Sequence, residues 1–266
     1  MKQLIRAALT VMFAGALALG VSAQSTTPAQ STAPGQTDSS KQKGGEKTVE
    51  EAYLQESAET VMVRELSRSD DKDGKLVALA YARKAMDGGR KGDEIRSSLE
   101  YLALENTQVI ARSGGIGVAT NNFPDIRAKA CEYLGEFPSE EAKDTLVKVV
   151  LNSKVEDPMV LAEAIRSLGN IGINDNDEVV DAICYSVDHF ANVGVSEDRL
   201  AVYTCFAIQE LAEKAGGIKD IVTVTNTVMN FTKGSYVTPV KKVAMQTLEK
   251  LAGYQVKNNN ESKSTK

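Results

Sequence analysis

Two short acidic segments contain the residue types that bind calcium. Residues 69–74 read SDDKDG and residues 174–177 read NDND. A calcium loop of the EF-hand type needs an acidic first ligand, a glycine at the sixth position and a glutamate at the twelfth. Counted from Ser69, the first position is Ser and the twelfth is Ala80, and 174–177 lacks the glycine after its third ligand. We therefore expect acidic turns that cap the following helices, with no bound metal.

A glycine-rich segment carries part of a dinucleotide-binding pattern. Gly115 and Gly117 match the first two glycines of G-x-G-x-x-G, but Thr120 occupies the third position. No strand–turn–helix pattern surrounds the segment, although the dinucleotide turn requires one. We expect a loop here and no cofactor.

His189 is the only histidine, so zinc binding or a Ser-His-Asp or Cys-His-Asp site would depend on it. No second histidine is available as a ligand, and no nucleophile motif such as G-x-S-x-G occurs. His189 also lies on the side of its predicted helix away from the apolar residues Val180, Ile183, Cys184 and Val187. We predict a surface histidine suited to an interface, with no catalytic residue and no metal site.

The three cysteines, Cys131, Cys184 and Cys205, form no C-x-x-C motif. Their odd number leaves at least one thiol free even where disulfides are allowed. Cys131 and Cys205 fall on apolar helix faces, where a free cysteine acts as a small apolar residue. We predict three buried thiols. A disulfide between Cys184 and Cys205, on consecutive predicted helices, is the alternative.

The elements that must position these residues follow one repeating helical pattern. Ile126, Ala130 and Leu134 recur as Val160, Ala164 and Leu168, and again in 203–211 and 240–248. The spacing i, i+4, i+8 places each set on one side of a helix. The central alanines recur every ~30–50 residues, the range of stacked helical hairpins. A hairpin of this kind buries its apolar face only by packing against its neighbours.

Residues 157–169 resemble the D-P-x-V-x-x-x-A-x-x-x-L-G pattern of HEAT repeats, and most closely the short HEAT-like variety first described in phycobilisome lyases. Ile126 and Arg127 resemble the apolar–Arg pair of that family. The resemblance covers about 75–253 and is strongest in 124–169. It implies an all-α fold, an α-solenoid of about four to five stacked HEAT-like helical hairpins, but no particular activity.

One segment of the repeat region has conflicting signals. Residues 218–231 contain IVTVTNTV, and β-branched residues favour a strand. Ile221, Val224, Val228 and Met229 also fit one side of a helix. We predict a helix, because the repeat context should override local propensity.

The chain divides into four parts. Residues 1–23 have the charges, apolar run and small residues of a secretory signal peptide. Residues 24–47 form a Ser/Thr/Pro/Gln linker that we expect to be disordered, 48–253 form the solenoid, and 254–266 form a disordered polar tail. No later segment is apolar enough to span a membrane. We expect export, to the periplasm in a diderm bacterium and otherwise by secretion.

Charge and composition restrict the function. The formal charge is −5 and becomes more negative when Lys2 and Arg6 leave with the signal peptide, so a general nucleic-acid binder is not expected. No group of titratable residues predicts an active site. We therefore predict a non-enzymatic protein-binding scaffold or adaptor of the cell envelope, with a protein partner of unknown identity and no small-molecule substrate.

The predicted partner-binding surface lies on the second helix of each hairpin, opposite the apolar side. Its residues are Lys148, Tyr185, Asp188, His189, Asn226 and Asn230. The alternative function comes from the family resemblance alone. It is an accessory subunit or enzyme of the HEAT-like lyase type that acts on a small ligand.

Overall fold

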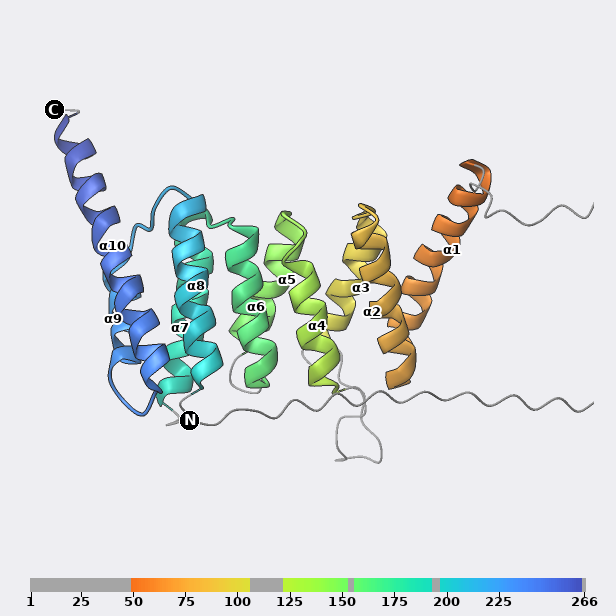
Figure 1. The fold of residues 1–266 in the computed structure, drawn as a ribbon, viewed down its shortest axis with the longest axis horizontal. Coiled ribbons are helices and arrows are strands. Elements are labelled where there is room, and N and C mark those ends of the chain that lie inside the picture. The colour runs from red at the N-terminus through yellow and green to blue at the C-terminus, as the bar shows by residue number, and fades with distance from the viewer. Residues whose placement is uncertain (1–48, 106–121, 153–155, 193–196, 265–266) are drawn as a thin grey trace, which may run out of the picture. The chain divides into compact units, whose positions relative to one another are not determined.

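A computed structural model describes residues 49–105, 122–152, 156–192 and 197–264, which lie in one compact unit of the chain. The predicted signal peptide, the linker and the glycines of 115–117 lie outside the described residues. The helices stand in a row that follows the chain from α1 to α10 (Figure 1).

The described residues form helices and contain no strand, which confirms the all-α prediction. The elements are α1 Val49–Ser67, α2 Lys72–Asp87, α3 Asp93–Leu104, α4 Pro124–Leu134, α5 Glu140–Leu151, α6 Pro158–Ile171, the 3-10 turn η1 Asp175–Asp177, α7 Glu178–Asn192, α8 Asp198–Lys214, α9 Ile221–Thr232 and α10 Thr238–Ser264. The ambiguous segment 218–231 is therefore helical, as predicted, because α9 covers most of it.

The helices pack in two layers. In the first layer α2, α4, α6, α8 and α10 contact one another in that order, and in the second layer α3, α5, α7 and α9 do the same. Helix α1 packs against both α2 and α3 at the end of the stack. Four hairpins between α2 and α9, followed by α10, agree with the predicted solenoid.

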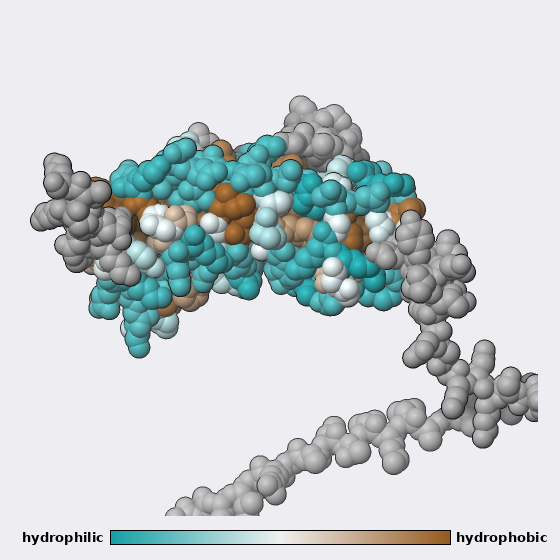
Figure 2. All heavy atoms as spheres, turned by 90° about the horizontal axis from the view of Figure 1, so that it is seen from above, coloured by the Kyte–Doolittle hydropathy of each residue, from teal (hydrophilic) through white to brown (hydrophobic). Residues whose placement is uncertain are grey.

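The repeated apolar stripe forms the core between and within the layers. Ala130, Ala164 and Ala244 have no exposed surface, and Ala207 is 1% exposed. Seen from above, hydrophobic residues run along the middle of the stack and hydrophilic residues line its two margins (Figure 2). The pattern therefore marks the packed side of each helix.

Small residues let the helices of the first layer approach closely. A Cβ atom placed on Gly169 of α6 would lie 2.6 Å from the Cα atom of Ala207 in α8. A Cβ atom on Gly135, at the end of α4, would lie 2.7 Å from the Ser167 hydroxyl of α6. These distances are shorter than any normal contact between carbon atoms.

Arg127 of α4 forms a buried link between neighbouring hairpins. Its guanidinium donates to the Ala103 carbonyl at the end of α3, at 3.2 and 3.1 Å, and to both carboxylate oxygens of Glu156, at 2.7 and 2.6 Å. Both charged side chains are at most 2% exposed. Because a buried charge is costly without a partner, this pair fixes the position of α4 relative to the segment before α6.

Lys75 of α2 has the same role one hairpin earlier. Its ammonium donates to the Ser67 carbonyl at the end of α1, at 3.3 Å, and to Glu105 Oε1, at 2.7 Å. Lys75 and Arg127 each hold the fourth position of their helix. The structure thus shows a repeated cation–carbonyl–carboxylate link that the apolar pattern does not predict.

Helix α10 differs from the sequence prediction at its C-terminal end. We expected the helix to end near Gly253 and a disordered tail to cover 254–266, but α10 continues to Ser264. A glycine lowers helix stability by about 1 kcal/mol relative to alanine but keeps its backbone hydrogen bond. Because no proline follows Gly253, the helix continues through it.

Candidate binding surface

The outer face of the second layer carries the residues predicted to bind a partner. Helices α5, α7 and α9 lie side by side, so their exposed residues share this face. Lys148, Tyr185, Asn226 and Asn230 are exposed, and Asp188 and His189 are half-buried. The structure thus brings together residues that lie far apart in the sequence.

The outer side of α7 forms the centre of this face. Asp181, Tyr185 and Asp188 follow one another at i, i+4 and i+7, and therefore lie on the same side of the helix. Tyr185 is 55% exposed, and the other tyrosines whose side chains the structure describes are buried or half-buried. The predicted apolar side of α7, which includes Val180 and Val187, is buried.

Asp188 connects α7 to α9. Thr227 Oγ1 donates to Asp188 Oδ2 at 3.2 Å, and Asn230 lies one turn further along α9. Partial burial raises the pKa of Asp188, and the polar side chains of Thr227 and Asn230 oppose the shift because they stabilise the charged form. Two of the predicted residues, Asp188 and Asn230, therefore lie near each other on neighbouring helices.

Asp181 lies at the other end of the α7 stripe. Burial raises its pKa, and the negative charges of Asp177 and Asp220 raise it further. Within the part of the chain that the structure describes, neither Asp181 nor Asp188 forms an ion pair. The tyrosine is thus flanked by two carboxylates that have no cationic partner in the described structure.

The acidic segment 69–74 caps a helix, as predicted. Asp71 precedes α2, and its carboxylate accepts a hydrogen bond from the Gly74 N–H at 3.0 Å. Ser69 Oγ accepts one from the Asp71 N–H at 3.1 Å. The carboxylate thus satisfies a backbone donor of the first helical turn.

The acidic segment 174–177 caps α7 and also does more than the sequence predicted. Asn174 Oδ1 accepts hydrogen bonds from the first backbone N–H groups of α7. Asp177 is 5% exposed, and its Oδ2 accepts from the backbone N–H groups of Lys219 and Asp220 at 2.7 and 2.8 Å. Asn176 and Asp177 have positive φ angles of 53° and 67°, which direct the carboxylate across to the next hairpin.

The described ranges contain no group of three or more His, Cys, Asp or Glu side chains placed to hold a metal ion. In both acidic segments the side-chain oxygens instead accept hydrogen bonds from backbone N–H groups. Those oxygens are therefore used in capping.

All three cysteines are free and buried, so the prediction of buried thiols is confirmed and the alternative Cys184–Cys205 disulfide is not formed. Cys184 lies beside Thr227 of α9, whereas Cys205 lies beside Thr247 of α10, so the two thiols face different helices. Burial raises the pKa of Cys131 and Cys184 to about 12 and that of Cys205 to about 11.

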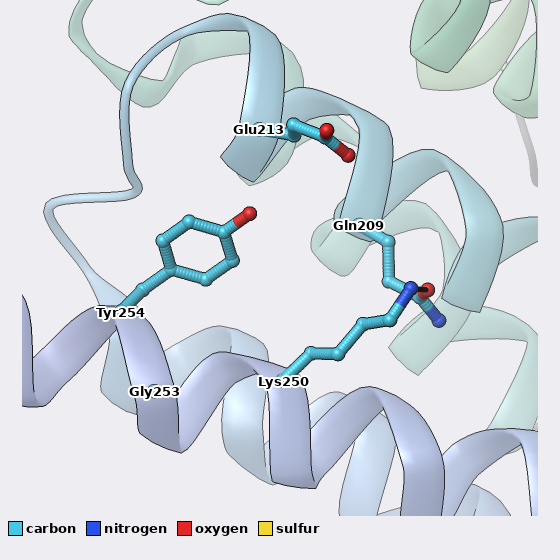
Figure 3. Close-up of a pocket in the computed structure, with 5 residues that line it drawn as sticks. All are labelled: Gln209, Glu213, Lys250, Gly253 and Tyr254. Atoms are coloured by element: carbon cyan, nitrogen blue, oxygen red, sulfur yellow. Dashed lines mark hydrogen bonds between the residues drawn. The ribbon is translucent and has the colours of Figure 1, made fainter.

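A pocket between α8 and α10 was not predicted from the sequence. It has a volume of about 290 Å³ and is lined by Gln209, Glu213, Lys250, Gly253 and Tyr254. Figure 3 shows the Tyr254 hydroxyl and the Glu213 carboxylate directed toward the space between the two helices. Lys250 Nζ donates to Gln209 Oε1 at 2.6 Å. A second hollow of about 560 Å³, beside Phe206, continues the groove.

Beside this groove, polar side chains link α8 to α10. Gln209 Nε2 donates to Thr247 Oγ1 at 2.6 Å, and Thr247 Oγ1 donates to the Val243 carbonyl at 2.9 Å. The neighbouring α6–α8 contact instead places Gly169 directly against Ala207. Helix separation depends on both partners of a contact, so the sequence of either helix alone did not indicate the pocket.

Comparison with known proteins identifies the repeats. A family profile described as HEAT repeats matches residues 117–189. Searches of curated proteins and of solved structures gave no match. The finer assignment to the phycobilisome-lyase variety stays a prediction. No helix in the described part of the chain has the length and apolar character needed to cross a membrane.

Proposed function

Because this chain is a HEAT-repeat solenoid, we propose that it is an exported, non-enzymatic scaffold that binds a protein partner in the cell envelope. A solenoid presents an extended surface made from equivalent helices, and such surfaces serve as binding platforms. The proposed binding face is the outer face of the second layer. Export rests on the signal-peptide pattern of residues 1–23.

The exposure of Tyr185 carries this proposal. Tyrosine is enriched at the energetic centres of protein interfaces, because it buries a large rigid ring and offers a hydroxyl group. Tyr185 occupies the middle helix of the face, with Lys148 on one side and Asn226 on the other. A partner that covered the ring would also contact these polar neighbours.

The pocket between α8 and α10 gives less support to an enzyme. Glu213 is the only carboxylate among its lining residues, and the Lys250 ammonium is bonded to Gln209. General acid–base catalysis usually requires titratable groups with shifted pKa values around one substrate. The lyase-type alternative would place its small ligand in this pocket and would not depend on Tyr185.

A pull-down with paired variants tests the proposal. The mature chain, Tyr185→Ala and Phe206→Ala are each used as bait in an envelope extract of the source organism. Phe206 is 47% exposed on the first layer, so its variant removes an equally accessible ring from the opposite side. We expect one stoichiometric protein that the Tyr185 variant loses and the Phe206 variant retains.

The opposite pattern, or no protein that depends on either ring, would contradict the proposed face. Export is tested separately. Fractionation and N-terminal sequencing should show a mature chain that begins at Gln24, and a full-length protein in the cytoplasm would contradict it.

A further inference from the structure

We infer that Asp181, Tyr185 and Asp188 receive a lysine or arginine side chain from the protein partner. This inference rests on the proposed function and adds the chemical class of the partner segment. The observations are the exposure of the ring, the two carboxylates on either side of it, and the cations that cover three other tyrosine rings.

Over three other tyrosine rings of the described solenoid lies a cation from a neighbouring helix or turn. Arg83 of α2 lies over Tyr133 of α4 at 5.5 Å, and Arg166 of α6 lies over Tyr203 of α8 at 5.4 Å. Arg68, which follows α1, lies over Tyr101 of α3 at 5.4 Å. A cation at such a distance is attracted by the negative face of the ring.

Tyr185 differs from these tyrosines. It is more exposed, and no cation from the described residues lies over its ring. Lys148 is the exposed cation on the preceding helix of the same layer, yet it forms no contact of this kind. The ring therefore has the surface that a cation would cover, without the cation.

The two aspartates complete the site for a cationic side chain. They lie one turn before Tyr185 and one turn after it on α7. Asp188 is held in place by Thr227. The stem of a lysine or arginine can lie along the ring while its charged end reaches a carboxylate. An acidic or purely apolar segment would leave both aspartates unpaired and less hydrated, which is unfavourable.

Peptide binding tests the inference. The probes are a fluorescein-labelled helical peptide of leucine and lysine, a leucine–arginine version and a leucine–glutamate version, and binding to the mature chain is measured by anisotropy at low and high salt. We expect both basic peptides to bind and the acidic peptide not to bind. Affinity should fall as salt rises, because exposed charge pairs are screened.

Variants assign the binding to these residues. Asp181→Asn and Asp188→Asn should each weaken the basic peptides about two- to fivefold, the range expected for one exposed ion pair. Tyr185→Ala should weaken them at every salt concentration, whereas Tyr185→Phe should retain binding because it keeps the ring. Glu213→Gln removes the same charge from the opposite layer and should have no effect.

Three results would overturn the inference: binding of the acidic peptide as tight as that of the basic ones, equal effects of Glu213→Gln and Asp181→Asn, or Tyr185→Phe as weak as Tyr185→Ala. If a partner is captured through Tyr185 but ignores salt and both Asp→Asn changes, the inference is wrong and the scaffold proposal stands. If capture does not depend on Tyr185, both are wrong.

Discussion

Replacing Gly169 with alanine should force α6 and α8 apart. The new Cβ atom would lie 2.6 Å from the Cα atom and 3.0 Å from the Cβ atom of Ala207. Carbon atoms pack best at about 3.5–4.0 Å, so the helices would have to separate by roughly 1 Å at this point. The atom in the way belongs to the α8 backbone and cannot rotate aside.

Two opposing effects set the magnitude. Overpacking of this kind typically costs about 1–3 kcal/mol. Replacing glycine with alanine inside a helix by itself raises the free energy of unfolding by about 0.5–1 kcal/mol. We therefore expect Gly169→Ala to lower the free energy of unfolding by up to about 2.5 kcal/mol, and by roughly 1 kcal/mol near the middle of the two ranges.

Gly253 provides a matched control within the same protein. It lies inside α10, and a Cβ atom placed on it would meet nothing within 4 Å. Gly253→Ala should therefore raise the free energy of unfolding by about 0.5–1 kcal/mol, because only the helix-propensity effect applies. The difference between the two variants isolates the steric cost.

Urea unfolding and hydrogen exchange measure the outcome. In a solenoid each hairpin contacts only its neighbours, so Gly169→Ala should speed exchange in α6 and α8 more than in α2 and α3. If Gly169→Ala stabilises the protein as much as Gly253→Ala, α6 and α8 do not approach each other as closely at Gly169 as the structure shows. Uniform loss of protection along the chain would instead indicate one cooperative unit.

Three further predictions concern buried polar groups. Arg127→Met should lower the free energy of unfolding by about 3–5 kcal/mol, because it removes the buried guanidinium that neutralises the Glu156 carboxylate, and adding Glu156→Met should restore part of the loss in urea unfolding; additive losses of the two variants would contradict the pair. Asp177→Ala should cost about 1–3 kcal/mol and speed hydrogen exchange at the Lys219 and Asp220 amides, and unchanged exchange there would refute its bracing role. The three cysteine thiols should react with a thiol reagent at about pH 8 only after unfolding, because burial raises their pKa values and blocks access, whereas rapid labelling of the folded chain would show that a thiol is exposed.

Local features of the fold could be read from the sequence because they depend on residues close together in the chain. The stripe that contains Ala130 and Ala164 repeats within one helix, and all of its central alanines are buried as predicted. Asp157 caps α6 by accepting from the Met159 N–H two residues later. The helical state of α9 required one more step, because repeat context had to outweigh its β-branched residues.

The predicted surface shows where sequence reasoning reached its limit. Helical periodicity placed Tyr185 and Asp188 on the outer side of α7, and the structure agrees. Periodicity could not show that Thr227 of α9 hydrogen-bonds to Asp188, nor that no cation of the described residues covers the Tyr185 ring as Arg166 covers Tyr203. These contacts depend on how neighbouring hairpins are stacked.

The sequence by itself determined which residues form helices and which side of each helix is buried, because both follow from spacing within a few turns. The tertiary structure decided which distant groups meet. Asp177 accepts from a backbone amide 42 residues away, and Arg127 pairs with a carboxylate 29 residues away. Such partners are set by the separation and rotation of packed helices, which depend on both surfaces of each contact and not on the periodicity of either one.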